Sequence, residues 1–130
     1  MATGENPSMN DLEINRTPAA VDAILSDTEA LGFNMVSEPR VGSFLAALAA
    51  SKPAGRFLEL GTGTGHGTAW LLAGMDAAST LETVDTDADC VAVAQRHLGS
   101  DRRVTFLITD GADFLQRSAP GQFDLIYADA

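Results

Sequence analysis

The chain has 130 residues, of which 45% are hydrophobic and 20% are charged, a composition typical of one globular domain. Its longest uninterrupted apolar run covers residues 44–50, far short of the roughly 20 residues that cross a bilayer. The net charge of -10 disfavours binding to nucleic acid or to anionic lipid. We therefore expect a soluble or peripheral protein that acts on a small molecule.

Cysteine usage and the first residues indicate the compartment. Cys90 is the only cysteine, so the chain cannot form an internal disulfide. Residues 1–10 are polar and lack the basic leader and apolar core of a targeting signal. We expect a cytoplasmic protein in which residues 1–16 form a flexible N-terminus and residues 17–130 form one domain.

The first two predicted elements are helices. The pair Thr17-Pro18 is typical of a helix start, and Gly32 is typical of a helix end. A second helix is predicted over the alanine- and leucine-rich residues 41–50, ended by the pair Lys52-Pro53. Both segments carry apolar residues at helical spacing.

From Arg56 onward, short apolar runs alternate with segments of helical length. The runs predict strands over residues 56–60, 80–85, 104–109 and 123–128. The segments between them predict helices over residues 67–75, 87–98 and 112–117. Thr86 and Asp89 fit a capping box at the start of the middle helix, and Gly99 fits its end.

This alternation predicts the fold class. Strands separated by helices need crossover connections, which join parallel strands. We expect an α/β fold, a Rossmann-like doubly wound parallel sheet with helices on both faces and two leading helices. Right-handed crossovers predict the strand order third, second, first, fourth, with a ligand crevice between the first and fourth strands.

The strongest chemical signal is the glycine-rich stretch ELGTGTGHG over residues 59–67. Alternate glycines let a backbone turn tightly and approach a ligand, beside the free N–H groups of a helix start. A P-loop is excluded because the only lysine, Lys52, precedes the stretch. The dinucleotide pattern GxGxxG fails in every register, since His66, Thr68 or Trp70 takes the place of its third glycine. An acid two residues before a GxGxG run remains.

The arrangement resembles the first motif of the class I S-adenosylmethionine-dependent methyltransferases. The resemblance implies that Glu59 helps to hold the methionine ammonium of the cofactor. It implies that Gly61, Gly63 and Gly65 let the loop pass under the cofactor. It also implies that Asp85, at the end of the second strand, accepts both ribose hydroxyls, for which one carboxylate has two oxygens.

The same resemblance implies that Asp110 and Gly111, after the third strand, contact the adenine ring. The candidate cofactor-binding residues are therefore Ser37, Glu59, Gly61, Gly63, Gly65, His66, Gly67, Asp85, Asp110 and Gly111. The cofactor implied is S-adenosyl-L-methionine. No catalytic residue is assigned from the sequence.

Within that class, the chain most resembles the small-molecule O-methyltransferases of the catechol and caffeoyl-CoA type. The likeness covers about residues 37–130 and is carried by the segments LEL, GTGTGHG, VDTDADC, VTFLITDGADFL and FDLIYAD. It implies methyl transfer to a hydroxyl oxygen of a small molecule. It also implies that Asp129 is one of three ligands of a divalent metal such as Mg, the other two ligands and a lysine base lying beyond Ala130. His66 is a departure, because tyrosine is usual in its place.

Several of these residues have a plainer alternative. Residues 61–67 also fit a structural turn without a ligand, and Asp129 fits a capping or solvated acid. His66 fits either a donor to a bound carboxylate or a cover for the loop. Trp70 and Cys90 stand at helical spacing and are expected to be packing residues.

Other functions are weighed against the methyltransferase. A nicotinamide-dependent oxidoreductase shares the acid after the second strand but needs an intact GxGxxG. A non-catalytic binding module for S-adenosylmethionine is a further alternative. An EF-hand starting at Asp85 is excluded, because its sixth and twelfth positions are Cys90 and Arg96.

The last predicted strand, over residues 123–128, is apolar enough to belong inside a sheet. An exposed edge of this kind can pair with another chain. We therefore expect the sequence to be the N-terminal part of a domain of about 200 residues or more. Alone it is expected to form a homodimer through that edge, to aggregate, or to be marginally stable.

Overall fold

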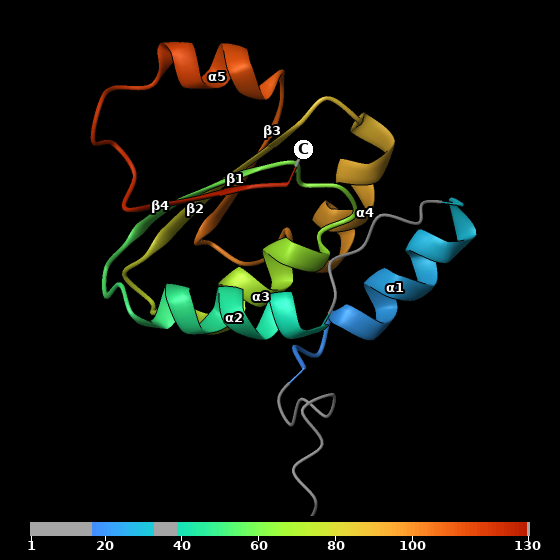
Figure 1. The fold of residues 1–130 in the computed structure, drawn as a ribbon. Coiled ribbons are helices and arrows are strands. Elements are labelled where there is room, and N and C mark those ends of the chain that lie inside the picture. Colours follow the sequence, from blue (N-terminus) through green and yellow to red (C-terminus); the bar gives the residue numbers. More distant parts are fainter. Residues whose placement is uncertain (1–16, 33–38, 130) are drawn as a thin grey trace, which may run out of the picture.

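The strands form one parallel sheet in the expected order. The computed structural model of the protein describes residues 17–32 and 39–129. The strands are β1 (Arg56–Leu60), β2 (Thr80–Asp85), β3 (Val104–Ile108) and β4 (Leu125–Ala128). They lie in the order β3-β2-β1-β4, and every pairing is parallel (Figure 1). The predicted strand order is confirmed.

Helices cover both faces of this sheet. In the described part of the chain they are α1 (Val21–Ala30), α2 (Pro39–Ala50), α3 (His66–Gly74), α4 (Ala88–Leu98) and α5 (Gly111–Arg117). In Figure 1, α2 and α3 lie together on one face with α4 and α1 beside them, and α5 lies on the other face. The doubly wound α/β fold class is therefore confirmed.

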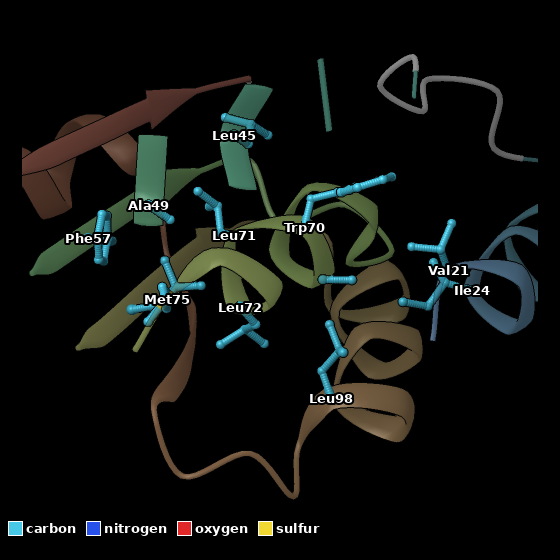
Figure 2. Packing of buried hydrophobic residues seen from close by; sticks show 12 residues of the cluster. Val21, Ile24, Leu45, Ala49, Phe57, Trp70, Leu71, Leu72, Met75 and Leu98 are labelled. Carbon is cyan, nitrogen blue, oxygen red and sulfur yellow. The ribbon is translucent and has the colours of Figure 1, made fainter. Parts of the chain in front are cut away.

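The larger hydrophobic core lies between the sheet and helices α1 to α4. Phe57 and Leu81 of the sheet share this cluster with Trp70 and Leu71 of α3. Ile24 of α1 joins it from the far side of α3 (Figure 2). All of these side chains are almost fully buried, so α1 is part of the folded unit.

The face under α5 has a much smaller core. Its buried residues are Leu58, Leu60 and Val84. Side chains alternate along a strand, so these residues point away from the larger core. Phe114 of α5 packs against them, while Ile126 of β4 is 49% exposed. This side of the sheet is therefore only thinly covered.

Helix α1 begins later than predicted. The amide of Val21 donates to the Pro18 carbonyl in a turn, and the helix follows with Ala20 at its cap and no side-chain cap bond. The predicted start at Thr17-Pro18 is wrong by about one turn. Gly32 has a φ of +71° just after the helix, as expected for a helix end. Helix α2 begins at Pro39, which suits the first helical position.

Helix α4 is capped by Asp87 rather than by the predicted Thr86. The Asp87 carboxylate accepts hydrogen bonds from the amides of Asp89 and Cys90 at 3.1 Å each. The helix therefore starts one residue later than expected, because a carboxylate reaches two free N–H groups from that position. Gly99 ends the helix as predicted.

Strand β4 lies at one edge of the sheet in the described part of the chain. Within residues 17–32 and 39–129, β4 pairs with β1 alone. Pairing with a second copy through the other side of β4, like marginal stability, stays a prediction.

None of the described helices is long and apolar enough to span a membrane. The N-terminal segment expected to be flexible, residues 1–16, lies outside the described residues.

Candidate functional site

The candidate site lies where the chain leaves the carboxyl ends of the parallel strands. The loop 61–65 connects β1 to α3, Asp85 ends β2, and Asp110 follows β3. The loop is attached to β2 through its backbone, because the Gly61 amide donates to the Val84 carbonyl at 2.7 Å. Doubly wound sheets bind their ligands at this edge. The topology therefore gathers the candidates predicted from the sequence.

Three glycines of the loop have left-handed backbone conformations. Their φ angles are +101° at Gly61, +52° at Gly63 and +98° at Gly65, which residues with a Cβ rarely adopt. At Gly65 a Cβ would also come 2.8 Å from the Cβ of Ala94 on α4. The GxGxG spacing is therefore needed by the turn itself, and its last glycine also lets the loop pack closely on α4.

Residues of the loop alternate between the interior and the surface. Thr62 and Thr64 are buried, whereas Gly61 and Gly63 are partly exposed. The hydroxyl of Thr62 lies 2.7 Å from the hydroxyl of Thr83 on β2. The accessible part of the loop is therefore glycine backbone, which a ligand can approach without meeting a side chain.

Glu59 lies behind the loop rather than at its surface. It is 1% exposed, and its Oε1 accepts hydrogen bonds from the hydroxyls of Thr68 at 2.5 Å and Thr83 at 2.7 Å. Burial raises the pKa of Glu59 to about 7, helped by the charges of Asp129 and Asp85 and opposed by the threonine bonds. The carboxyl group is therefore buried behind the loop, and its contact with a ligand ammonium stays a prediction.

Gly67, in the first turn of α3, makes room for that carboxyl group. A Cβ at Gly67 would come 2.7 Å from Oε2 of Glu59. Gly67 is itself buried. Glu59 and Gly67 therefore pack against each other behind the loop, and contact of Gly67 with a ligand stays a prediction.

Asp85 is held against the loop by both of its carboxylate oxygens. Its Oδ2 accepts a hydrogen bond from the Gly63 amide at 2.8 Å, and its Oδ1 accepts one from the Asp87 amide at 3.0 Å. Each oxygen has two lone pairs, so each keeps one for a further donor. The side chain is partly exposed. Its carboxylate is thus held in place by two backbone amides.

Asp110 and Gly111 form a more open part of the same edge. Asp110 is exposed and caps α5, its Oδ2 accepting from the Asp113 amide at 3.1 Å. A Cβ at Gly111 would lie 3.4 Å from Leu60, which is ordinary contact, so space does not require glycine there. Adenine contact by these two residues stays a prediction.

Asp129 follows β4 and is exposed, with its backbone amide donating to the Leu60 carbonyl at 2.8 Å. Over residues 17–32 and 39–129, no three histidine, cysteine, aspartate or glutamate side chains gather as metal ligands. Divalent cations such as Mg take about six oxygen ligands. The described residues do not complete such a site, and the role of Asp129 as one of three ligands of a divalent metal stays a prediction.

His66 contributes a polar group that has no partner in the described residues. It is 6% exposed, and its Nδ1 is buried without a hydrogen bond. Burial lowers the pKa of the imidazole, which favours the neutral ring. An unpaired buried nitrogen costs free energy. Contact of His66 with a ligand stays a prediction, because this nitrogen is itself buried.

The remaining residues singled out from the sequence either pack in the interior or lie outside the described residues. Trp70 is buried, and its ring lies where a Cβ on Gly42 of α2 would be. Cys90 is buried, and burial raises the pKa of its thiol to about 11, which leaves it protonated and unreactive. Both were expected to be packing residues. Ser37 lies outside the described residues.

The sequence reasoning missed a set of threonines that support the site. They are buried within and behind the loop: Thr28, Thr62, Thr64, Thr68 and Thr83. A usable signal was present for the loop, because threonine fills the places between the glycines of GTGTG. Buried hydroxyls need partners, and here they find one another and Glu59.

Comparison with known proteins agrees with this geometry. A family model described as a methyltransferase domain matches residues 58–130, more than half of the chain. A candidate O-methyltransferase of Mycobacterium sp. (strain KMS) is 30% identical over 98% of this chain and 62% of its own length. The catechol O-methyltransferase of Niastella koreensis is 33% identical over 84% of this chain and 54% of its own length.

A solved structure is similar in three dimensions. The O-methyltransferase TomG from Streptomyces achromogenes, involved in tomaymycin synthesis and determined in complex with SAM, matches with a TM-score of 0.76 and 25% identity. The match covers 88% of this chain and 55% of TomG. The chain thus spans between half and two thirds of the length of these relatives. With its parallel order β3-β2-β1-β4 and its matched domain, the chain belongs to the class I methyltransferases.

Proposed function

We propose that the chain binds S-adenosylmethionine at the carboxyl edge of its sheet, and that the protein is an O-methyltransferase that acts on a small molecule. One observation carries this proposal: the two oxygens of Asp85 are held by the amides of Gly63 and Asp87, beside a loop of left-handed glycines. A ribose presents two adjacent hydroxyl donors that match two carboxylate oxygens.

The other contacts follow from exposure and position. The partly exposed backbone of Gly61 and Gly63 lies under the cofactor. His66, at the end of the loop, is 6% exposed and lies next to the polar end of the cofactor. Asp110 and Gly111 take the adenine end, at the open side of the same edge. Glu59 acts through the loop, because it is buried beneath it.

When bound, S-adenosylmethionine supplies a methyl group on a cationic sulfur. The protein therefore contributes mainly by holding cofactor and acceptor in line, and by accepting the proton of the acceptor hydroxyl. Among the described residues we assign no base for that proton. A small hydroxyl acceptor is supported by the names of the relatives, one of them a catechol O-methyltransferase. The net charge of -10 further supports an acceptor that is not a nucleic acid.

Calorimetric titration of the 130-residue chain with S-adenosylhomocysteine and, separately, with NADH tests the cofactor. We expect saturable binding of the homocysteine product and none of NADH. Binding of NADH alone would overturn the proposal in favour of the nicotinamide-dependent oxidoreductase.

A methyl-transfer assay with S-adenosylmethionine and a set of small hydroxyl acceptors, catechol included, tests the reaction. Transfer to oxygen in any of them supports the O-methyltransferase. Product binding without transfer to any acceptor would instead favour the binding module.

We also infer a cytoplasmic location. The single cysteine is buried and its thiol has a raised pKa, as suits a chain that needs no disulfide. Cell fractionation checks this, and recovery in a secreted or membrane fraction would contradict it.

A further inference from the structure

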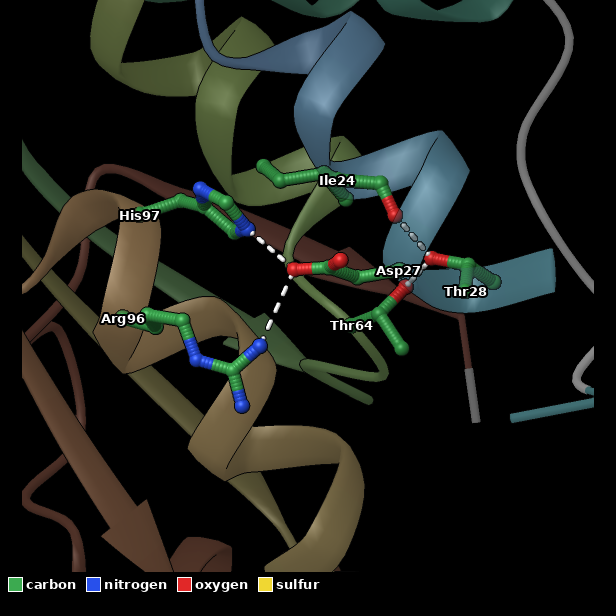
Figure 3. A network of polar contacts seen from close by, with 6 residues as sticks. All are labelled: Ile24, Asp27, Thr28, Thr64, Arg96 and His97. Atoms are coloured by element: carbon green, nitrogen blue, oxygen red, sulfur yellow. Dashed lines mark hydrogen bonds and ion pairs between the residues drawn. The ribbon is translucent and has the colours of Figure 1, made fainter. Parts of the chain in front are cut away.

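Helix α1 reaches the glycine loop through a pair of buried hydroxyl groups. Thr28, in the last turn of α1, is 1% exposed, and its Oγ1 lies 2.7 Å from the Oγ1 of Thr64. Thr64 stands between Gly63 and Gly65, which both have left-handed backbones. Figure 3 shows the two threonines facing each other where the helix meets the loop. A residue far upstream in the sequence thus contacts the centre of the loop.

The Thr28 hydroxyl contacts two acceptors, the Thr64 hydroxyl oxygen and a carbonyl of its own helix. The Oγ1 of Thr28 is also 2.5 Å from the Ile24 carbonyl oxygen, to which its hydroxyl donates. A hydroxyl has one proton and two acceptor lone pairs. Thr28 is the donor in both contacts, so its one proton is shared between the Ile24 carbonyl and the Thr64 hydroxyl oxygen, which accepts from it. A valine at position 28 keeps the shape of threonine but leaves Thr64 without this partner.

The neighbouring residue attaches α1 to α4. The Oδ2 of Asp27 lies 2.7 Å from Nε2 of His97 and 3.0 Å from Nη1 of Arg96 (Figure 3). The hydrogen bond from His97, more than the nearby charges, lowers the pKa of Asp27. Because Gly65 packs against Ala94 of α4, the loop is held between these two helices.

We propose that Thr28 is a positioning residue for the cofactor loop. Its hydroxyl holds Thr64, and thereby keeps the backbone between Gly63 and Gly65 in the conformation that receives the cofactor. Thr28 is buried behind the loop, so it acts through Thr64 and not on the ligand. The effect extends to Asp85, because the Gly63 amide donates to that carboxylate. This inference rests on the proposed function.

The test is the affinity of the 130-residue chain for S-adenosylhomocysteine, measured by calorimetry. Thr28→Val and Thr64→Val are each expected to weaken binding about three- to tenfold, the range of one buried hydrogen bond. The double variant is expected to bind no more weakly than either single variant, because both changes remove the same contact. Thr28→Ser keeps the hydroxyl and should keep the affinity.

Two matched variants separate this role from a merely structural one. Thr105→Val, at an exposed threonine of β3, should leave the affinity unchanged. Asp27→Asn loosens α1 on α4 but keeps the Thr28 hydroxyl, so it should lower the melting temperature with a smaller loss of affinity. The proposal is overturned if Thr28→Val lowers stability without weakening binding, or if Asp27→Asn weakens binding equally.

A second measurement keeps this inference separate from the proposed function. The Gly65 amide donates to the Thr62 carbonyl at 3.0 Å, so its hydrogen exchange reports the order of the loop without any ligand. If the wild-type chain binds no S-adenosylhomocysteine, the proposed function fails. The positioning role is then tested by the exchange rate of the Gly65 amide alone. This rate should rise in Thr28→Val and stay unchanged in Thr105→Val. An unchanged rate in Thr28→Val overturns it.

Discussion

Two parts of the carboxyl edge of the sheet differ in how many hydrogen bonds hold their side chains and in how exposed those side chains are. On the loop side, Asp85 is held by two backbone amides, and the loop behind it is supported by buried threonines from α1, α3 and β2. On the open side, Asp110 makes one capping bond and both it and Asp129 are exposed. The side chains on the loop side thus have more hydrogen bonds and are more buried than those on the open side.

The difference follows from where each side sits over the core. The loop side lies over the large cluster that contains Phe57 and Trp70, whereas the open side lies near the small cluster around Leu58. A packed interior excludes water and makes each unpaired polar group costly, so it fixes hydrogen-bonded geometry. We therefore expect substitutions to matter most on the loop side and least on the open side.

Gly65→Ala should have the largest effect. The new Cβ would be forced into a backbone with φ of +98° and within 2.8 Å of Ala94. Left-handed strain and overpacking together should lower the free energy of unfolding by about 3 kcal/mol or more. Chemical denaturation measures this, and calorimetry should find no binding of S-adenosylhomocysteine.

Gly121→Ala is the matched control for that change. Gly121 has a φ of +73°, but a Cβ at this position would have no atom within 4 Å. Its cost should be limited to the backbone strain, about 1 kcal/mol. Equal losses at the two positions would show that close packing of the loop on α4 contributes nothing.

Glu59→Gln should change how stability depends on pH. The pKa of Glu59 is raised from 4.5 to about 7, so between these values the folded chain binds more protons than the unfolded chain. This group therefore makes the protein less stable as pH rises through that window, by on the order of 3 kcal/mol. Glutamine keeps an oxygen for the threonine hydroxyls and removes the titration.

Denaturation at pH 5 and pH 8 checks this sign. Relative to wild type, Glu59→Gln should gain stability at the higher pH, while Glu29→Gln, at an exposed glutamate of α1, should not. A constant difference at the two pH values would mean that Glu59 is ionised throughout.

Asp85→Ala should weaken S-adenosylhomocysteine binding and also lower the free energy of unfolding, because the amides of Gly63 and Asp87 lose their acceptor. Hydrogen bonds to a charged group contribute about 1.5 to 3 kcal/mol, so the loss should be about ten- to a hundredfold. Asp89→Ala removes an exposed acid nearby, in the first turn of α4, and should leave affinity unchanged. Retained affinity in Asp85→Ala would contradict the ribose contact.

Much of the fold was predictable because its signals are local. β1 and β2 have the predicted bounds, since each apolar run ends in residues that favour turns, and the strand order follows from the alternation with helices. The left-handed glycines were also readable from their spacing. The positions of Glu59 and Thr28 were not, because their contacts join residues distant in sequence and depend on packing.

Asp110→Ala tests the open side and should have the smallest effect. Loss of the capping bond to the Asp113 amide should lower the melting temperature by roughly 5 °C. Binding of S-adenosylhomocysteine should weaken about threefold at most, because an exposed side chain on a thinly packed face loses little when it is removed. Asp110→Asn keeps an oxygen for the cap and should recover the melting temperature. A loss of affinity larger than that of Asp85→Ala would reverse the comparison, because the open side would then contribute more to binding than the loop side.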